Sequence, residues 1–300
     1  MLTQDIKAYV LPRGLRLYNL LSKSLRQTRL GKSQFVLKNA RKIKSKLISK
    51  YVKIEGNKIF LDPLDSLNLS YGKPHEKIVT SIMKKIVKEG DCVIDIGAHI
   101  GFYSLFLAKM VGKNGHVYAF EPSSQNFELL KKNIKINGYQ NITPVQCGIS
   151  NKTGTCKLYL AYNSVGHRLY EIGDKSVAYK ETVEIQTLSL DDYFKNRESN
   201  PVRLIKMDIE GSEGWAFEGM RNILDKNHDV TLITEYGPYT MNESGYDPLE
   251  FIKNILKYLP KMYQITENEI KAVDLQQLTT HCNIQTKTST YLLFCRKLLD

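Results

Sequence analysis

Residues 93–101, VIDIGAHIG, place an acid before a glycine turn that joins two apolar runs. The spacing is neither the GxGxxG of a dinucleotide site nor the GxxxxGK[ST] of a phosphate-binding loop. A glycine turn between a buried strand and a helix lets a ligand approach the backbone closely, and Gly97 and Gly101 supply the flexible positions. The carboxylate of Asp95 would repel a pyrophosphate and attract an ammonium or sulfonium group. The turn therefore predicts a ligand that carries positive charge.

A second acid lies where ribose recognition needs one. Glu121 follows Gly101 by twenty residues, at the end of the next expected strand, where a carboxylate accepts hydrogen bonds from two ribose hydroxyls. The two acids and the glycines together predict an adenosine ligand without phosphates, and S-adenosyl-L-methionine is the common cofactor of that kind. The alternative is a tight corner that holds no ligand. The expected cofactor-binding residues are Glu76, Asp95, Gly97, Ala98, His99, Gly101, Glu121, Pro122, Gln146 and Cys147.

Some of these residues have competing interpretations. His99 either contacts the methionine end of the cofactor or caps the helix that follows. Cys147 is expected to form part of a pocket wall and not to act as a nucleophile, because no neighbour in sequence would lower the pKa of its thiol. Glu76 opens the helix before the first strand, where it could close over the cofactor.

The sequence MDIEG carries two acids at the end of another apolar run. In an extended chain Asp208 and Glu210 would point the same way, because side chains alternate with period two. Either one carboxylate is a general base while the other holds a neighbouring hydroxyl, or both bind a divalent cation that acidifies the acceptor. We favour the base, and Glu235 on the next strand completes the expected catalytic set. The alternative is that Asp208 or Glu210 caps a helix near Ser212; Lys206 could pair with Asp208.

Alternating strands and helices must position these residues. The pattern predicts an α/β fold with a parallel sheet covered on both faces and ligands at the carboxyl ends of its strands. Residues 151–200 form an insertion that, with the tail, is expected to shape the acceptor site. The expected strands are 51–62 (a hairpin at Gly56-Asn57), 92–96, 117–120, 142–147, 156–160, 183–187, 204–207, 230–234, 262–266 and 291–295, and the expected helices are 74–90, 121–138, 102–111, 190–194 and 248–258.

The positive charge of the chain is concentrated at its start. Residues 1–50 hold 13 of the 43 Lys and Arg residues but one of the 31 acids, which leaves 30 of each for residues 51–300. We therefore divide the chain into a basic leader (1–50), expected to form two amphipathic helices split at Gly31, and a catalytic domain (51–300). The leader could lie on an anionic membrane surface or on nucleic acid phosphates. The alternative is a helical arm packed on its own domain or on a second subunit.

The cysteines and the hydropathy point to a cytoplasmic protein. The five cysteines are widely spaced and contain no CxxC pair, which favours free and mostly buried thiols over disulfides or a zinc site. No apolar stretch approaches the ~18 residues that a membrane span needs. The expected location is the cytoplasm, with peripheral binding to the membrane through the leader as an option.

Several stretches together are similar to the FkbM-type methyltransferases, from about residue 52 to residue 296, with the leader outside. The resemblance implies a class I methyltransferase fold with seven strands, the last antiparallel, and O-methylation of a hydroxyl on a sugar, glycan or secondary metabolite. His99 replaces an Asn often found in the turn. The stretches are DIGAHIG (95–101), FEPSSQNFELLKKNIKING (120–138), TLSLDDYF (187–194), LIKMDIEGSE (204–213) and ITEYGP (233–238).

Two other functions compete with this one. An RNA-directed methyltransferase could use the basic leader for phosphate contacts, although the neutral body does not favour it. A membrane- or partner-binding module with a degenerate cofactor site is the other, and the intact acids and glycines argue against it. Methylation of a flipped base is not expected, because MDIEGSE lacks the proline and aromatic residue that would stack the base.

Overall fold

We analysed a computed structural model, which describes residues 33–48, 50–71, 75–173, 179–197 and 200–297. These residues form two compact units that meet in sequence between His75 and Glu76, and each is described by itself. The division into a leader of 50 residues and a catalytic domain remains a prediction.

The first unit contains one basic helix and a hairpin. Helix α2 (Gln34–Leu47) is the second of the two expected leader helices, whereas the first lies outside the described residues. Strands β1 (Tyr51–Ile54) and β2 (Asn57–Phe60) pair in antiparallel register and are followed by the short helix η2 (Leu69–Tyr71). The hairpin turn is Glu55-Gly56, one residue earlier than predicted, because both residues have the positive φ that a tight two-residue turn requires.

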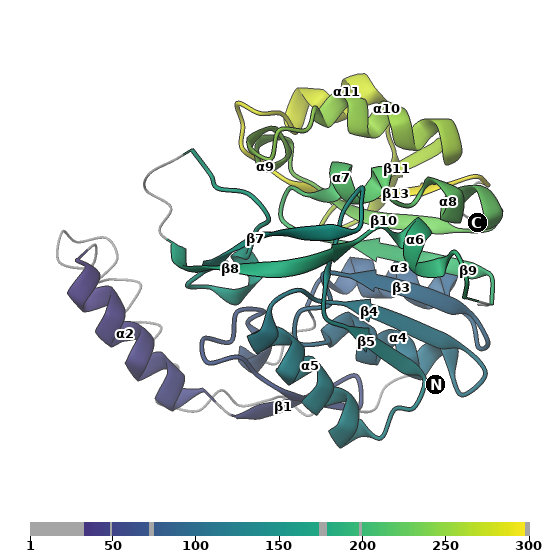
Figure 1. Ribbon diagram of the computed structural model, residues 1–300. Coiled ribbons are helices and arrows are strands. Elements are labelled where there is room, and N and C mark those ends of the chain that lie inside the picture. Colours follow the sequence, from purple (N-terminus) through teal and green to yellow (C-terminus); the bar gives the residue numbers. More distant parts are fainter. Residues whose placement is uncertain (1–32, 49, 72–74, 174–178, 198–199, 298–300) are drawn as a thin grey trace. The chain divides into compact units, whose positions relative to one another are not determined.

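The second unit is built on an eight-stranded mixed sheet (Figure 1). Five strands run parallel, in the order β10-β9-β3-β4-β5, and three antiparallel strands continue the sheet beyond β10 in the order β13, β11, β12. The strands are β3 (Cys92–Ile96), β4 (His116–Phe120), β5 (Ile142–Val145), β9 (Val202–Met207), β10 (Thr231–Tyr236), β11 (Lys261–Ile265), β12 (Ile270–Ala272) and β13 (Thr290–Cys295). The predicted α/β fold is confirmed, with eight strands instead of seven.

The helices cover both faces of this sheet. Alternate residues of β3, Cys92 and Ile94 among them, share a core with α6, α7, α8 and α10, while Asp95 points to the opposite face, where Ser104 of α4 reaches it. The helices are α3 (Lys77–Ile86), α4 (Phe102–Val111), α5 (Ser124–Asn137), α6 (Leu190–Phe194), α7 (Glu213–Glu218), α8 (Arg221–Lys226), α9 (Pro238–Glu243), α10 (Pro248–Tyr258) and α11 (Leu275–His281).

The insertion forms a sheet of its own. Strands β6 (Gly148–Ile149), β7 (Gly154–Ala161) and β8 (Tyr179–Leu188) make a three-stranded sheet in the order β6-β8-β7, with the short helix η3 (Ser164–Gly166) after β7. The strand predicted at 142–147 is therefore wrong at its end: the chain leaves the main sheet after Val145, and two residues later it joins β8 as β6.

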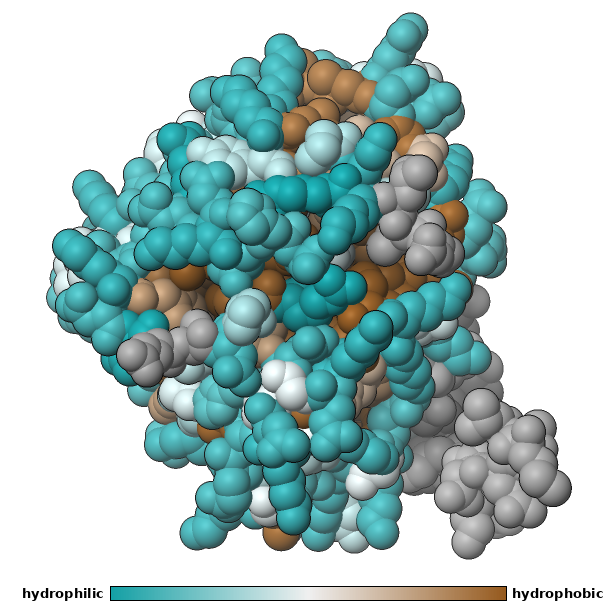
Figure 2. Space-filling view, turned by 90° about the vertical axis from the view of Figure 1, so that its right-hand side faces the viewer, coloured by the Kyte–Doolittle hydropathy of each residue, from teal (hydrophilic) through white to brown (hydrophobic). Residues whose placement is uncertain are grey.

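The surface and the thiols agree with the composition. All five cysteines are free, and all except Cys156 are buried, as predicted. Hydrophilic residues cover most of the face in Figure 2, and hydrophobic residues show mainly across its middle. None of the helices in the described parts of the chain is long and apolar enough to cross a membrane.

Candidate active site

The glycine turn after β3 is held by the end of β4. The backbone N–H groups of Gly97 and Ala98 both donate to the carbonyl oxygen of Phe120, at 3.0 and 2.9 Å, and the N–H of His99 donates to Glu121 Oε2 at 2.9 Å. These three amides are engaged within the protein and are not donors for a phosphate, which agrees with a ligand without phosphates.

Gly97 also brings two turns together: the glycine turn after β3 (97–101), which is the expected cofactor turn, and the turn after β9 (208–211), which is the expected catalytic turn. Its φ is +81°, and a Cβ atom at this position would lie 2.1 Å from the backbone oxygen of Asp208. The N–H of Asp208 in turn donates to the carbonyl of Ile96 at 3.2 Å. The chain needs glycine here because two turns, after β3 and after β9, pack backbone to backbone.

Glu121 is buried at the end of β4 and serves as a hub. Its Oε1 accepts from the N–H of Ser123 at 2.9 Å and from Asn126 at 3.4 Å, while Oε2 accepts from His99. Burial raises the pKa of Glu121 to about 7, although these hydrogen bonds oppose the shift. Burial thus favours the protonated form of this carboxyl, while its three hydrogen-bond donors favour the ionised form.

Asp95 lies deeper than the sequence suggested. It is fully buried, its Oδ2 accepts from Ser104 Oγ at 2.6 Å, and its Oδ1 is buried without a hydrogen-bond partner among the described residues. Burial raises the pKa of Asp95, and the nearby ammonium of Lys206 opposes this shift. The positive charge of Lys206 therefore already lies near Asp95.

The remaining expected cofactor residues differ in the contacts that they make. Glu76 precedes α3 in a left-handed conformation and accepts from the hydroxyl of Tyr103. His99 does not cap α4, whose N-cap is Gly101; its Nε2 instead lies 2.7 Å from Ser164 Oγ of the insertion. Pro122 follows Glu121 and is half-buried.

Gln146 and Cys147 lie at the end of β5. Gln146 is exposed and donates to Ser124 Oγ at 2.8 Å. Cys147 is buried, and burial raises the pKa of its thiol to about 12, so it is not a nucleophile.

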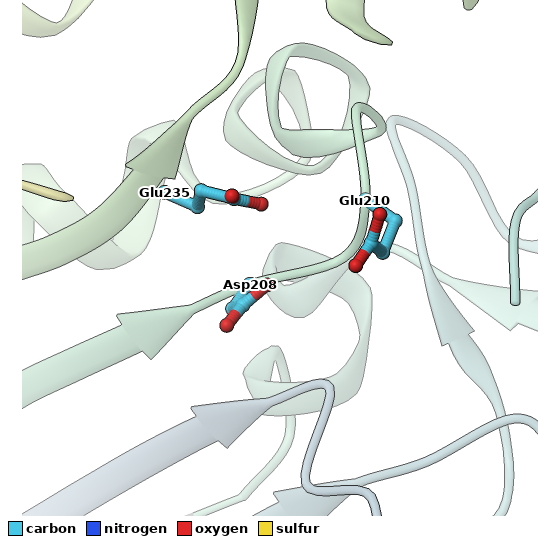
Figure 3. Close-up of side chains that lie close together, drawn as sticks. All are labelled: Asp208, Glu210 and Glu235. Carbon is cyan, nitrogen blue, oxygen red and sulfur yellow. The ribbon is translucent and has the colours of Figure 1, made fainter. Parts of the chain in front are cut away.

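The three expected catalytic acids come together. One carboxylate oxygen from each of Asp208, Glu210 and Glu235 lies within 4.8 Å of the others. In Figure 3, Glu235 extends from the end of β10 toward Glu210, and Asp208 follows β9. The reason differs from the predicted alternation along a strand: β9 ends at Met207, and Glu210 has a φ of +57°, so the chain turns back to bring its side chain to the others.

Two of the three acids have cationic partners. Lys206 Nζ lies 3.3 Å from Asp208 Oδ2, as the sequence suggested, and the hydroxyl of Tyr291 donates to the same oxygen at 2.5 Å. Arg168 Nη2 lies 2.8 Å from Glu210 Oε2. Although burial opposes it, the charges of Asp208 and Asp95 raise the pKa of Lys206, which keeps this buried ammonium protonated.

Glu235 has no ion pair within the described residues. Burial, followed by the charges of Asp208 and Glu210, raises the pKa of Glu235 well above its ordinary value. Burial raises the pKa of Glu210 as well, and the charge of Asp208 adds to that shift, whereas Arg168 opposes it. The three oxygens could also hold a divalent cation, which would compete with Lys206 and Arg168 for the same carboxylates.

The turn after β9 is held by a residue that the sequence argument missed, and Ser212, the N-cap of α7, makes no side-chain capping hydrogen bond. Glu213, buried in the first turn of α7, accepts from the N–H groups of Ile209 and Gly211, both at 2.9 Å. The side chains of Asp208 and Glu210 lie close to that of Glu235 instead. Burial raises the pKa of Glu213 to about 8. The sequence could have indicated this role of Glu213, because an acid three residues after Glu210 falls in the first turn of the expected helix.

Parallel strands flanked by helices, a glycine turn after one strand and an acid after the next define a Rossmann-like fold of the class I methyltransferases. A sequence model of the methyltransferase FkbM domain matches residues 95–265. The chain belongs to this family and is an S-adenosylmethionine-dependent methyltransferase, which confirms the resemblance and the cofactor predicted from the sequence.

Two curated relatives share about a quarter of their aligned residues with this chain. The chain is 23% identical over 190 residues to the methyltransferase sdnD of Sordaria araneosa, covering 52% of this chain and 73% of that protein. It is 25% identical over 192 residues to the hexuronic acid methyltransferase AglP of Haloferax volcanii, covering 64% and 71%. Among solved structures it is similar to a SAM-dependent O-methyltransferase of Thermotoga maritima, with a TM-score of 0.40, 14% identity and coverage of 87% and 83%.

The residues around the turn fit S-adenosylmethionine. The donor set contains carboxylates at Asp95 and Glu121, the stretch 93–104 carries no Lys or Arg, and the amides of the turn are bonded internally. Ribose hydroxyls can donate to Glu121, and an ammonium or sulfonium is tolerated beside these acids.

Proposed function

We propose that this methyltransferase acts on a hydroxyl group of a sugar, glycan or secondary metabolite. The observation that carries the proposal is the convergence of Asp208, Glu210 and Glu235 directly beside the cofactor turn. Paired carboxylates suit hydroxyl acceptors, since they can accept hydrogen bonds from adjacent hydroxyls and take up a proton. The name of the AglP relative, a hexuronic acid methyltransferase, points to the same class of acceptor.

The chemistry needs a proton acceptor and alignment. Bound S-adenosylmethionine supplies an electrophilic methyl group and leaves as S-adenosylhomocysteine. The acceptor oxygen forms the new bond to the methyl carbon as the carbon–sulfur bond breaks, and a carboxylate of the cluster takes the hydroxyl proton. We assign Asp208 to this cluster as the central group, because Lys206 and Tyr291 fix its position.

Transfer of labelled methyl groups tests the proposal. The purified full chain is incubated with methyl-labelled S-adenosylmethionine and, in separate reactions, with fractionated cell glycans, lipids, small metabolites and RNA. We expect label in the glycan fraction or in lipid-linked saccharides, in a form that resists mild base as an ether does. Label in RNA alone would reject the sugar assignment, and label in no fraction would reject the proposed function.

We further propose that the leader holds the enzyme at an anionic membrane surface. Helix α2 contains no acid, and the exposed residues Lys42, Ile43 and Lys46 place cations beside an apolar side chain. The full chain should sediment with vesicles that contain phosphatidylserine but not with neutral vesicles, and Lys42→Glu with Lys46→Glu should reduce the bound fraction. Equal binding by the variant and the wild type would reject this role.

A further inference from the structure

The turn that carries Glu210 has an unusual backbone. Glu210 has a φ of +57°, in the left-handed region that side chains other than those of Gly, Asn and Asp rarely adopt. Such a conformation costs about 1 kcal/mol or more and persists where the surroundings hold it. Glycine would relieve this strain, so a reason for glutamate must lie in its side chain.

Several contacts hold this turn from outside. The hydroxyl of Tyr170 donates to the carbonyl oxygen of Glu210 at 2.7 Å, and Ser244 Oγ donates to the carbonyl oxygen of Gly211 at 2.7 Å. The packing is close, because a Cβ atom on Gly211 would lie 2.5 Å from the Tyr170 hydroxyl and 2.6 Å from the backbone of Thr240. The turn therefore has little freedom to relax.

The side chain of Glu210 is held by the segment that also contains Tyr170. Arg168 Nη2 contacts Glu210 Oε2 at 2.8 Å, and both side chains are largely buried, with 15% and 26% exposed. Arg168 is itself anchored, since its backbone exchanges two hydrogen bonds with Tyr159 of β7, at 2.8 and 3.2 Å. Two residues of the insertion, Arg168 and Tyr170, thus contact the carboxylate and the backbone of Glu210 respectively.

We propose that Arg168 and Tyr170 are positioning residues for acceptor binding, holding the Glu210 carboxylate toward Asp208 and Glu235. The inference rests on the proposed function, because the acceptor hydroxyls would bind at these carboxylates. It assigns a role to two residues of the insertion: the insertion meets His99 of the glycine turn through Ser164, whereas Arg168 and Tyr170 contact Glu210. Acceptor binding should therefore respond to changes here while cofactor binding does not.

The test compares Arg168→Gln, Arg168→Lys and Tyr170→Phe with the wild type in the full chain. The acceptor is whichever of the glycan, lipid or small-metabolite fractions takes label from S-adenosylmethionine with the wild type. For Arg168→Gln we expect the fraction concentration for half-maximal rate to rise about tenfold, the loss typical of one charge-assisted hydrogen bond. Arg168→Lys should recover part of this loss, since it keeps the charge but not the planar fork. Tyr170→Phe should change it in the same direction by about threefold.

Two readouts separate positioning from folding. The affinity for S-adenosylhomocysteine, by calorimetry, and the thermal midpoint should stay close to wild type in Arg168→Lys and Tyr170→Phe. Arg221→Gln is the matched control, because it removes another Arg–Glu pair, with Glu218, that lies on α7 and α8. Wild-type acceptor dependence in Arg168→Gln, or an equal loss in Arg221→Gln, would overturn the positioning role. Absence of label with the wild type would reject the proposed function, and the positioning role with it.

Discussion

The carboxyl group of Glu121 connects burial with cofactor affinity. Its pKa of about 7 results from burial, so the folded protein holds a proton there that the unfolded chain releases near pH 4.5. The folded-state pKa is raised, so this contribution to stability is complete below about pH 4.5 and is lost as the pH rises toward 7. Cofactor binding has the opposite preference, because ribose hydroxyls donate best to the ionised carboxylate.

We therefore predict that affinity for S-adenosylhomocysteine falls as the pH is lowered below 7. The dissociation constant should rise by up to about tenfold per pH unit, measured by calorimetry between pH 5.5 and 8. Glu121→Gln should bind more weakly at pH 8 and lose this dependence. A wild-type affinity that is constant across the range would show that Glu121 does not meet the ribose.

At the catalytic turn the prediction concerns Asp208. Asp208→Asn should lower methyl transfer by at least about a hundredfold, since a positioned proton acceptor contributes that much or more, while S-adenosylhomocysteine still binds. Label transfer and calorimetry measure the two effects. The control is Asp229→Asn, which alters an exposed pair with Lys297 before the start of β10, at the end of the strand opposite to Glu235. Retained turnover in Asp208→Asn would remove this residue from the reaction.

Between elements, the contact of the two turns is the structural basis of the site. Gly97→Ala introduces a Cβ atom 2.1 Å from the backbone of Asp208 as well as strain at a positive φ. Gly138 at the end of α5 has a φ of +72° but nothing within 4 Å of its Cβ position, so Gly138→Ala carries the strain alone.

We expect Gly138→Ala to cost about 1–2 kcal/mol of unfolding free energy from strain at positive φ, measured in urea. Gly97→Ala should cost at least about 2 kcal/mol more, because the packing of backbone on backbone cannot relax, and it should also weaken cofactor binding. Equal stabilities for the two variants would mean that the two turns do not depend on each other.

The elements that local signals define could be predicted from the sequence. Strand β3, with α4, α6 and α10, has the predicted bounds, because an apolar run or helical period ends at a glycine, proline or cap. Where the end depends on tertiary structure the prediction is less accurate. Helix α3 ends at Ile86 and not at Gly90, since Val87 is already extended. The strand β12 and the helices α8, α9 and α11 were missed, because they are short and have weak periodicity.

At the scale of the whole molecule, the site depends on pairings that no local pattern reveals. Asp208, Glu210 and Glu235 could be predicted because each lies at the end of an apolar run. Tyr291 could not, because it reaches Asp208 only through the antiparallel register of β13 on β10, in which it lies opposite Glu235. The last strands, beyond the residues that match the family model, thus supply a partner to the central acid.

We predict that Tyr291→Phe lowers turnover about tenfold while S-adenosylhomocysteine affinity is unchanged. The variant removes the Tyr291 hydrogen bond to Asp208 Oδ2 and leaves the Lys206 contact. Loss of this hydrogen bond should cost about 1–2 kcal/mol of the interaction that orients Asp208. Tyr193→Phe on α6 is the control, because its ring packs against Tyr118 and Phe194 away from the acids. If Tyr291→Phe were as active as Tyr193→Phe, the acid cluster would not need this strand, and the site would be complete within the residues that end at β10.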